Sequence, residues 1–198
     1  MKLSKLLLAT IGATVLLGAL VGSASARSFS TTSQTLRATF REVRFNGAFG
    51  NITCQVTLEG SLHARTIAKT VGSLIGYITA AVLGPCAEGQ ATILRETLPW
   101  HARYLAFTGT LPNIVTIRIN VTGASFRIRE PLATCLATST AEAPAIGTFN
   151  RNTTTGALET AEIGGTIPTT CGVNGTFASN RGPVTVLNST TRITVTLI

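Results

Sequence analysis

Aspartate is absent from this 198-residue chain, and several other reactive residue types are scarce. All eight acidic residues are glutamates, and the chain has two His, two Tyr and one Trp. Without aspartate, a Ser–His–Asp triad, an aspartic dyad and an EF-hand cannot be built. The motifs G-x-S-x-G and H-E-x-x-H are also missing. These absences exclude several common hydrolase sites and the common calcium loop.

Charge is also scarce and is unevenly divided between the two signs. Only 12% of residues are charged, and the net charge is +8. There is no basic run and no nucleic-acid-binding motif, so we expect no nucleic-acid partner. The positive balance favours contact with anionic or polysaccharide components of a cell envelope. Arginines scattered along strand faces would equally serve solubility and edge protection.

The N-terminus has the pattern of a targeting segment. Met1–Lys5 is basic, Leu6–Val21 is uncharged and apolar, and Ala24–Ala26 is a small-x-small cleavage pattern. We expect a signal peptide at residues 1–26 and a single secreted or envelope-associated β-rich domain at 27–198, without a transmembrane helix after cleavage. The alternative is an uncleaved membrane anchor.

Four cysteines, Cys54, Cys86, Cys135 and Cys171, lie beyond the targeting segment. An even number in an exported chain predicts two disulfides, for which three connectivities exist. Shorter loops favour Cys54–Cys86 and Cys135–Cys171. No C-x-x-C pair occurs, and no histidine lies at zinc-ligand spacing from a cysteine, so we expect neither a metal site nor a cofactor.

Alternating apolar residues predict strands in the first third of the chain. Apolar positions alternate over Leu36–Phe40 and then slip in phase to Val43 and Phe45, which predicts a β-bulge. Asn46-Gly47 is a turn signal. Residues Ile52–Leu58 then alternate cleanly, and Cys54 falls on their apolar, inward face.

The same alternation recurs over Val115–Val121, Phe126–Ile128 and Ile193–Leu197, with Gly, Pro and Asn turn signals along the chain. Such a series of short strands predicts an all-β fold, either a β-sandwich or a small barrel-like domain with two disulfides.

One uncharged segment, Thr70–Ala87, is ambiguous between a helix and a strand. Its apolar residues fit a helical stripe, but Gly72 and Gly76 would each cost about 1 kcal/mol inside a helix. We predict a strand buried on both faces at Ser73–Leu83. A second strand is expected at Ala91–Thr97.

The only Trp lies in the central stretch LPWHARYLAFTGT. In a strand, Trp100 and Tyr104 share one face, and His101 and Arg103 share the other. Pro99 favours a strand start or an edge. Trp100 and Tyr104 could stack a sugar or another flat ligand, and His101 with Arg103 could bind an anion. The alternative is that the aromatic pair packs in the core and the histidine is satisfied by a neighbouring strand.

Three functions remain open at this level. The first is a non-catalytic, secreted binding or structural module of the cell envelope that uses the Trp100 and Tyr104 region. The second is a secreted hydrolase in which His63 or His101 acts with a glutamate, although we assign no catalytic residue. The third is a homo-oligomeric envelope or pore-forming protein, because charged residues are few.

Three short runs carry a resemblance to a known group of proteins. They are TLPWHARY at Thr97–Tyr104, GTLPN at Gly109–Asn113 and the closing ITVTLI at Ile193–Ile198. In these runs the chain resembles uncharacterised exported β-rich proteins of high-GC actinobacteria. The resemblance implies an exported bacterial protein and implies no activity, ligand or site.

Overall fold

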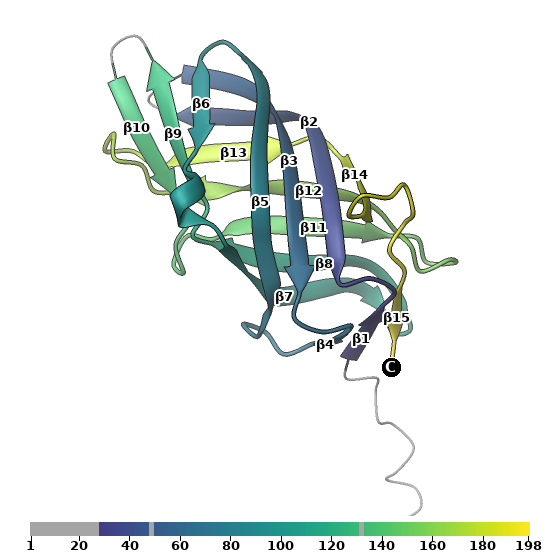
Figure 1. Cartoon of the computed structure of the whole chain (residues 1–198). Helices are drawn as coiled ribbons and strands as arrows, with labels where there is room; N and C mark the ends of the chain where they lie inside the picture. Colours follow the sequence, from purple (N-terminus) through teal and green to yellow (C-terminus); the bar gives the residue numbers. More distant parts are fainter. Residues whose placement is uncertain (1–27, 48–49, 131–132) are drawn as a thin grey trace, which may run out of the picture.

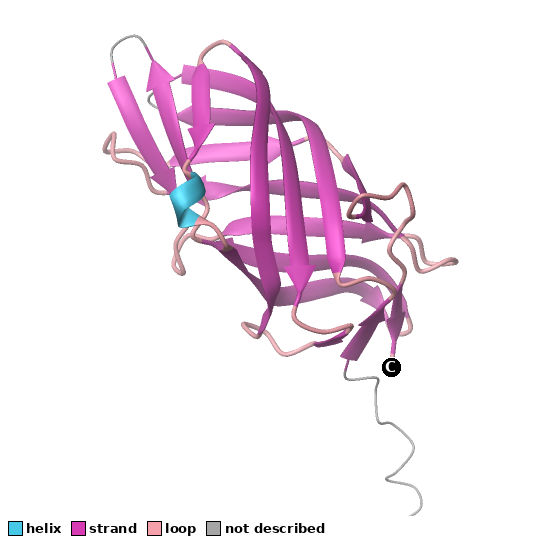
Figure 2. Ribbon diagram, viewed as in Figure 1, coloured by secondary structure: helices cyan, strands magenta, loops and turns pink. Residues whose placement is uncertain are grey.

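The protein is almost entirely β-structure, as the alternating pattern predicts. The computed structural model describes residues 28–47, 50–130 and 133–198, so the expected signal peptide at 1–26 lies outside the described residues. Figure 2 shows strands throughout, with one short 3-10 turn, η1, at Arg95–Thr97. Within the described ranges, no helix has the length and apolarity needed to cross a membrane.

Fifteen strands are assigned in the described residues. In chain order they are β1 (Ser28–Thr31), β2 (Thr35–Gly47), β3 (Gly50–Leu62), β4 (Thr66–Ala68), β5 (Leu74–Ala87), β6 (Gln90–Ile93), β7 (Trp100–Thr110), β8 (Asn113–Thr122), β9 (Ser125–Glu130), β10 (Ala133–Thr138), β11 (Ala145–Arg151), β12 (Leu158–Ile167), β13 (Gly175–Ser179), β14 (Gly182–Val186) and β15 (Val195–Leu197).

The largest sheet is antiparallel and closes on itself. Its order is β11-β8-β7-β5-β3-β2-β13-β12-β14, and additional β11–β12 and β2–β14 pairings join its ends. Strands β13 and β14 both run beside β2 and β12, so they occupy one position in the ring. Closure removes the exposed edges of the sheet. Of the two predicted architectures, the chain therefore adopts the barrel.

Bulges let the long strands wrap around this barrel. The register of β2 against β3 shifts between Phe40 and Val43, where the apolar phase slips in the sequence. Two further shifts interrupt the pairing of β3 with β5. A bulge bends its strand and increases the local twist. Figure 1 shows the result, with β3 and β5 crossing steeply in front of β8, β11 and β12.

A small sheet lies at each end of the barrel (Figure 1). Strands β15, β1 and β4 form one, which we call the terminal cap, and strands β10, β9 and β6 form the other, the disulfide cap. Each cap contributes a buried phenylalanine. Phe29 of the terminal cap packs against Tyr104, with ring centroids 6.0 Å apart. Phe126 of the disulfide cap packs against Trp100, with ring centroids 5.7 Å apart.

Both disulfides have the predicted connectivity, and none of the cysteines is free. Cys54 and Cys86 face each other in register on the neighbouring strands β3 and β5. Cys54 is 1% exposed, in agreement with its predicted inward position. Cys135 of β10 joins Cys171, in the segment between β12 and β13, and so ties the disulfide cap to the barrel.

The ambiguous segment is a strand, but two details predicted for it and for the strand that follows are wrong. Strand β5 is not buried on both faces: Val82 is 49% exposed, because a closed sheet has an outer face that meets solvent. The second strand ends at Ile93 and is followed by the 3-10 turn instead of reaching Thr97. Pro99 directly precedes the start of β7, as one of its two predicted roles requires; β7 is not an edge strand, since it pairs with β5 on one side and with β8 on the other.

Candidate functional site: an apolar cavity inside the barrel

The two aromatic residues of the central stretch face the barrel interior. Trp100 is 1% exposed and Tyr104 is 2% exposed. The indole N–H of Trp100 donates a hydrogen bond to Oγ1 of Thr97 over 2.8 Å. An exposed platform for stacking a sugar is therefore not formed, and the core alternative holds for both residues. They share a strand face as predicted, but the sheet closes over that face.

The other two predicted binding residues, His101 and Arg103, are exposed on the outer face of β7. The Arg103 guanidinium donates to the carbonyl of Gly72 over 3.0 Å. The ring of His101 lies edge-on to Tyr77, with centroids 5.3 Å apart. The ring of His63 also lies edge-on to Tyr77, with centroids 4.8 Å apart. The outer face thus brings the two histidines of the chain to one tyrosine.

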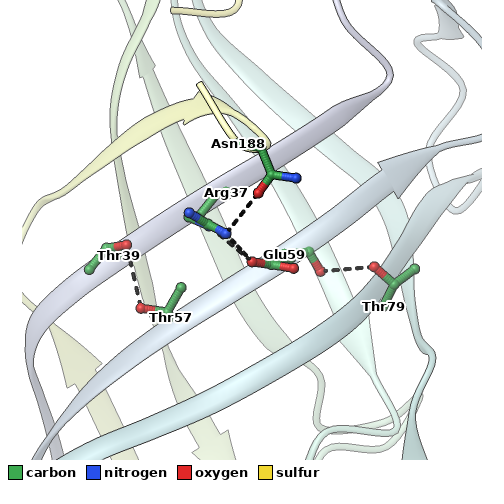
Figure 3. A network of polar contacts seen from close by, with 6 residues as sticks. All are labelled: Arg37, Thr39, Thr57, Glu59, Thr79 and Asn188. Atoms are coloured by element: carbon green, nitrogen blue, oxygen red, sulfur yellow. Dashed lines mark hydrogen bonds and ion pairs between the residues drawn. The ribbon is translucent and has the colours of Figure 1, made fainter. Parts of the chain in front are cut away.

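Neither histidine is paired with a glutamate in the described residues. Glu59, the nearest candidate in sequence to His63, accepts hydrogen bonds from Arg37 at 2.6 and 2.9 Å, as Figure 3 shows. The same arginine also donates to Oδ1 of Asn188. Within the described ranges, no group of three or more His, Cys, Asp or Glu side chains could hold a metal ion. The arrangement needed for the hydrolase alternative is not found there.

An apolar cavity of about 100 Å³ lies inside the barrel. Side chains from β2, β3, β5, β7, β8, β11 and β12 line its wall, and the terminal cap contributes Phe29, Thr31, Ile67 and Val195. A second, smaller void of about 30 Å³ lies toward the disulfide cap and is bordered by Trp100. The cavity therefore occupies the half of the barrel nearest the terminal cap.

Small residues at inward positions explain why the larger cavity exists. They occur on six different strands of the ring: Ala38, Gly60, Gly76, Ala102, Gly147 and Ala161. All three glycines, Gly76 included, also allow close approach of neighbouring groups. A Cβ at Gly60 would lie 2.9 Å from the carbonyl oxygen of Tyr77, and one at Gly147 would lie 2.9 Å from a side-chain carbon of Ile119. Larger residues at these positions are thus excluded by the wall itself.

The unfilled volume has a cost in stability. At roughly 24 cal/mol per Å³, a cavity of this size lowers the free energy of unfolding by about 2 kcal/mol relative to a filled core. Dry apolar cavities of comparable size, about 150 Å³, bind benzene or xenon. The interior can therefore accept a small apolar molecule and recover dispersion contacts that the empty wall lacks.

Tyr104 is one of the residues that line this apolar space. It lies beside Ile119, its register partner on the neighbouring strand β8, and both residues line the cavity. Burial raises the pKa of the Tyr104 phenol above its ordinary value, so the hydroxyl stays protonated at neutral pH. The buried indole of Trp100 on the same strand face has its hydrogen-bond partner in Thr97.

Two residues of the lining strands, Glu59 and Glu162, carry partly exposed carboxylates that pair with arginines. Glu59 pairs with Arg37 at 2.6 Å, and Glu162 pairs with Arg181 at 2.7 Å. Thr31 also borders the cavity, and its hydroxyl donates to the carbonyl of Arg65 over 3.2 Å. These three polar side chains are thus engaged with protein partners.

Sequence reasoning missed the residues that form the cavity. Gly60 follows Leu58 and precedes Leu62 on one inward face, so it interrupts an apolar series. A glycine inside a strand pattern often marks a bulge or a close approach by a ligand or a backbone. Gly60 gives that signal, but a signal from one strand could not show that small residues of six strands line the same part of the barrel interior.

Comparison of the chain with family models, curated proteins and solved structures finds no match.

Proposed function

We propose that this chain is a secreted, non-catalytic binding module that holds a small apolar molecule inside its barrel. The observation that carries the proposal is the apolar cavity of about 100 Å³, which the inward small residues leave unfilled at a cost in stability. Ligand sites are typically concave and mostly apolar, with few polar groups, and eight-stranded barrels can enclose one small ligand.

Secretion is supported by two features of different kinds. The N-terminal segment at 1–26 has the sequence pattern of a signal peptide. All four cysteines are joined in disulfides, which persist in oxidising compartments. The anionic or polysaccharide partners expected from charge would have to use the outer surface, because Trp100 and Tyr104 are buried. A pore is less well supported, since the interior wall is apolar.

The proposal is tested by following methyl NMR signals while methylcyclopentane is added to the purified chain. We expect shifts at Ile119, which lines the cavity, and none at Val82, which is exposed on the outer face. Ala102→Leu places a larger side chain in the cavity and should abolish the shifts. Absence of any shift at Ile119 in the unmodified chain would contradict the proposal.

The control variant lies on the same strand. Ala106 pairs with the exposed Arg118, so Ala106→Leu adds the same bulk outside the barrel and should leave binding intact. Ala161→Val gives a smaller filling substitution on β12, in case leucine at position 102 overpacks the core. Equal loss of binding in the inner and outer leucine variants would argue against a site in the cavity.

A further inference from the structure

We infer that one outer side of the barrel binds an acidic polysaccharide, a polymer of sugar rings that carry carboxylates. The surface consists of His63, Tyr77, His101, Arg103 and Arg118, and we call it the basic face. Tyr77 is half-buried and the other four residues are exposed. The inference goes beyond the proposed ligand of the cavity, because it concerns the exterior of the molecule.

The first observation is the distribution of negative charge around the barrel. Four consecutive strands of the ring, β11, β8, β7 and β5, contain no glutamate, and the chain has no aspartate. The other side of the ring does carry glutamates, namely Glu42 on β2, Glu59 on β3, and Glu159 and Glu162 on β12. One strand free of glutamate therefore separates β7 from β3, and another separates β8 from β12. An anionic partner on β7 and β8 meets positive groups without adjoining carboxylates.

The second observation is that the arginines of the basic face are not used in ion pairs. The ion pairs among the described residues are Arg37–Glu59, Arg44–Glu42 and Arg181–Glu162. Arg103 donates to the carbonyl of Gly72, but a guanidinium has five N–H groups, so donors remain. Arg118 is exposed on β8. Because a guanidinium matches a carboxylate through two parallel hydrogen bonds, both arginines suit a partner that carries carboxylates.

The third observation is that the basic face forms a row. Tyr77 of β5 is in register with His101 of β7, and Arg103 follows two residues later on the same side of β7. Arg103 is in register with Asn120 of β8, and Arg118 lies two residues from Asn120 in the same direction. Residues related diagonally in this way lie about 7–8 Å apart. The groups thus cross three strands in sequence instead of surrounding one point, which favours an extended polymer over a single small anion.

The rings at one end of this row favour sugar as the repeating unit. Tyr77 contacts both histidines edge-on, with ring centroids 4.8 Å from His63 and 5.3 Å from His101. Tyrosine and histidine combine an apolar body with a polar tip, so they contact the C–H groups of a sugar and also bond its hydroxyls. Thr122, in register with His101 on β8, adds a hydroxyl beside them. An acidic peptide has no sugar rings to use these groups.

The partner is tested by titrating four probes into the purified chain. Decagalacturonate carries ten carboxylates on sugar rings, decaglutamate carries ten without sugar rings, dextran is a neutral polysaccharide, and phosphatidylglycerol vesicles present an anionic lipid surface. We expect decagalacturonate to bind most tightly, and added salt to weaken its binding because salt screens exposed charges. Equal or tighter binding of decaglutamate, dextran or the vesicles would overturn the assignment to an acidic polysaccharide.

Two variants matched in charge locate the surface. Arg103→Gln with Arg118→Gln removes two positive charges from the basic face, and Arg44→Gln with Arg181→Gln removes two from exposed positions elsewhere. We expect the first variant to weaken decagalacturonate binding by about three- to thirtyfold, the scale of two exposed charge pairs, and the second to change it by less than about twofold. Equal weakening in both would overturn the basic face as the site. Arg118→Gln alone provides the same comparison if the double variant does not fold.

The role of the rings is tested separately from that of the charges. His101→Ala removes an exposed ring and keeps both arginines of the basic face. It should weaken decagalacturonate binding by about two- to tenfold, the scale of one aromatic contact, and change decaglutamate binding by less than about twofold. An equal effect on the two polymers would overturn the contribution of the rings to sugar recognition. Binding of methylcyclopentane should be the same in all of these variants, so failure on the basic face is distinguishable from failure of the cavity proposal.

Discussion

Trp100 and Thr97 are joined by a hydrogen bond of 2.8 Å from the indole N–H to the threonine hydroxyl. Thr97 ends the 3-10 turn, and Trp100 begins β7, so the bond fixes the entry of the chain into the barrel. The threonine hydroxyl in turn donates to the carbonyl of Leu94 over 2.7 Å. The indole is thus fixed by its ring contact with Phe126 and by the hydrogen bond of its N–H to Thr97.

Trp100→Ala should lower the free energy of unfolding by about 3–5 kcal/mol, because it removes a fully buried aromatic side chain. Thr97→Val should cost about 1–3 kcal/mol, since it leaves the indole N–H without its acceptor. Urea unfolding measures both changes. The fluorescence of the native protein should be blue-shifted and resistant to iodide. Ready quenching by iodide would contradict burial of Trp100.

Tyr104→Phe should leave the stability of the ligand-free chain unchanged or slightly raised. The substitution removes only the hydroxyl, and the ring contact with Phe29, which provides the apolar packing, remains. Denaturant midpoints of the two chains provide the measurement. A loss of more than about 1 kcal/mol would show that the hydroxyl is hydrogen-bonded in the free protein.

Alkaline pH should destabilise the protein in part through Tyr104. Because burial raises its pKa, the folded chain retains the phenol proton at pH values where the unfolded chain has lost it. The unfolded state then binds fewer protons, so stability falls as the pH rises above about 10, the ordinary tyrosine value. Unfolding of the unmodified chain and of Tyr104→Phe should be compared from neutral to alkaline pH. A decline of equal steepness in both would contradict this contribution.

The two disulfides should differ in what they protect. Each should contribute about 2–5 kcal/mol, and the intact mass of the native chain should show two closed bridges. Replacing Cys135 and Cys171 by serine should loosen the disulfide cap and increase hydrogen exchange in β9 and β10. Replacing Cys54 and Cys86 should instead act on the pairing of β3 with β5. Detection of free thiols in the native protein would contradict both bridges.

Removal of Ile193–Ile198 should give an unfolded or insoluble chain. Ile193 is 1% exposed and Val195 is 3% exposed, and β15 pairs with β1 in the terminal cap. Each buried side chain contributes about 1.5–3 kcal/mol, and their loss would also open the cavity to water. Thermal unfolding of the truncated chain tests this expectation. An unchanged melting temperature would show that the cap is dispensable.

Local patterns predicted the strands, because side-chain alternation depends only on which face of a strand is buried. The inward series Ile52–Leu58 and the bulge near Val43 were recognisable for this reason. Strand β5 was harder, since apolar residues such as Val82 occur on its outer face as well. When both faces of a strand carry apolar residues, the apolar and polar positions no longer alternate, and the sequence also fits a helix.

Closure and the cavity could not be predicted in the same way. The ring depends on pairings between strands distant in sequence, such as β2 with β14, and alternation contains no information about partners. The site depends on a further coincidence: Gly60, Ala102 and Gly147 must reach the same level of the wall. Only the register between strands, set by the bulges, places them there.

The first and last described residues, Ser28 and Ile198, are hydrogen-bonded to each other. The amide of Ser28 donates to the carbonyl of Ile198 over 3.2 Å, and the amide of Ile198 donates back over 3.1 Å. A short glycine-rich linker between these residues would make the backbone continuous, and new ends could be opened at an exposed hairpin elsewhere. The fold is therefore suited to circular permutation, which would move the point of attachment for a fused domain to the opposite pole of the molecule.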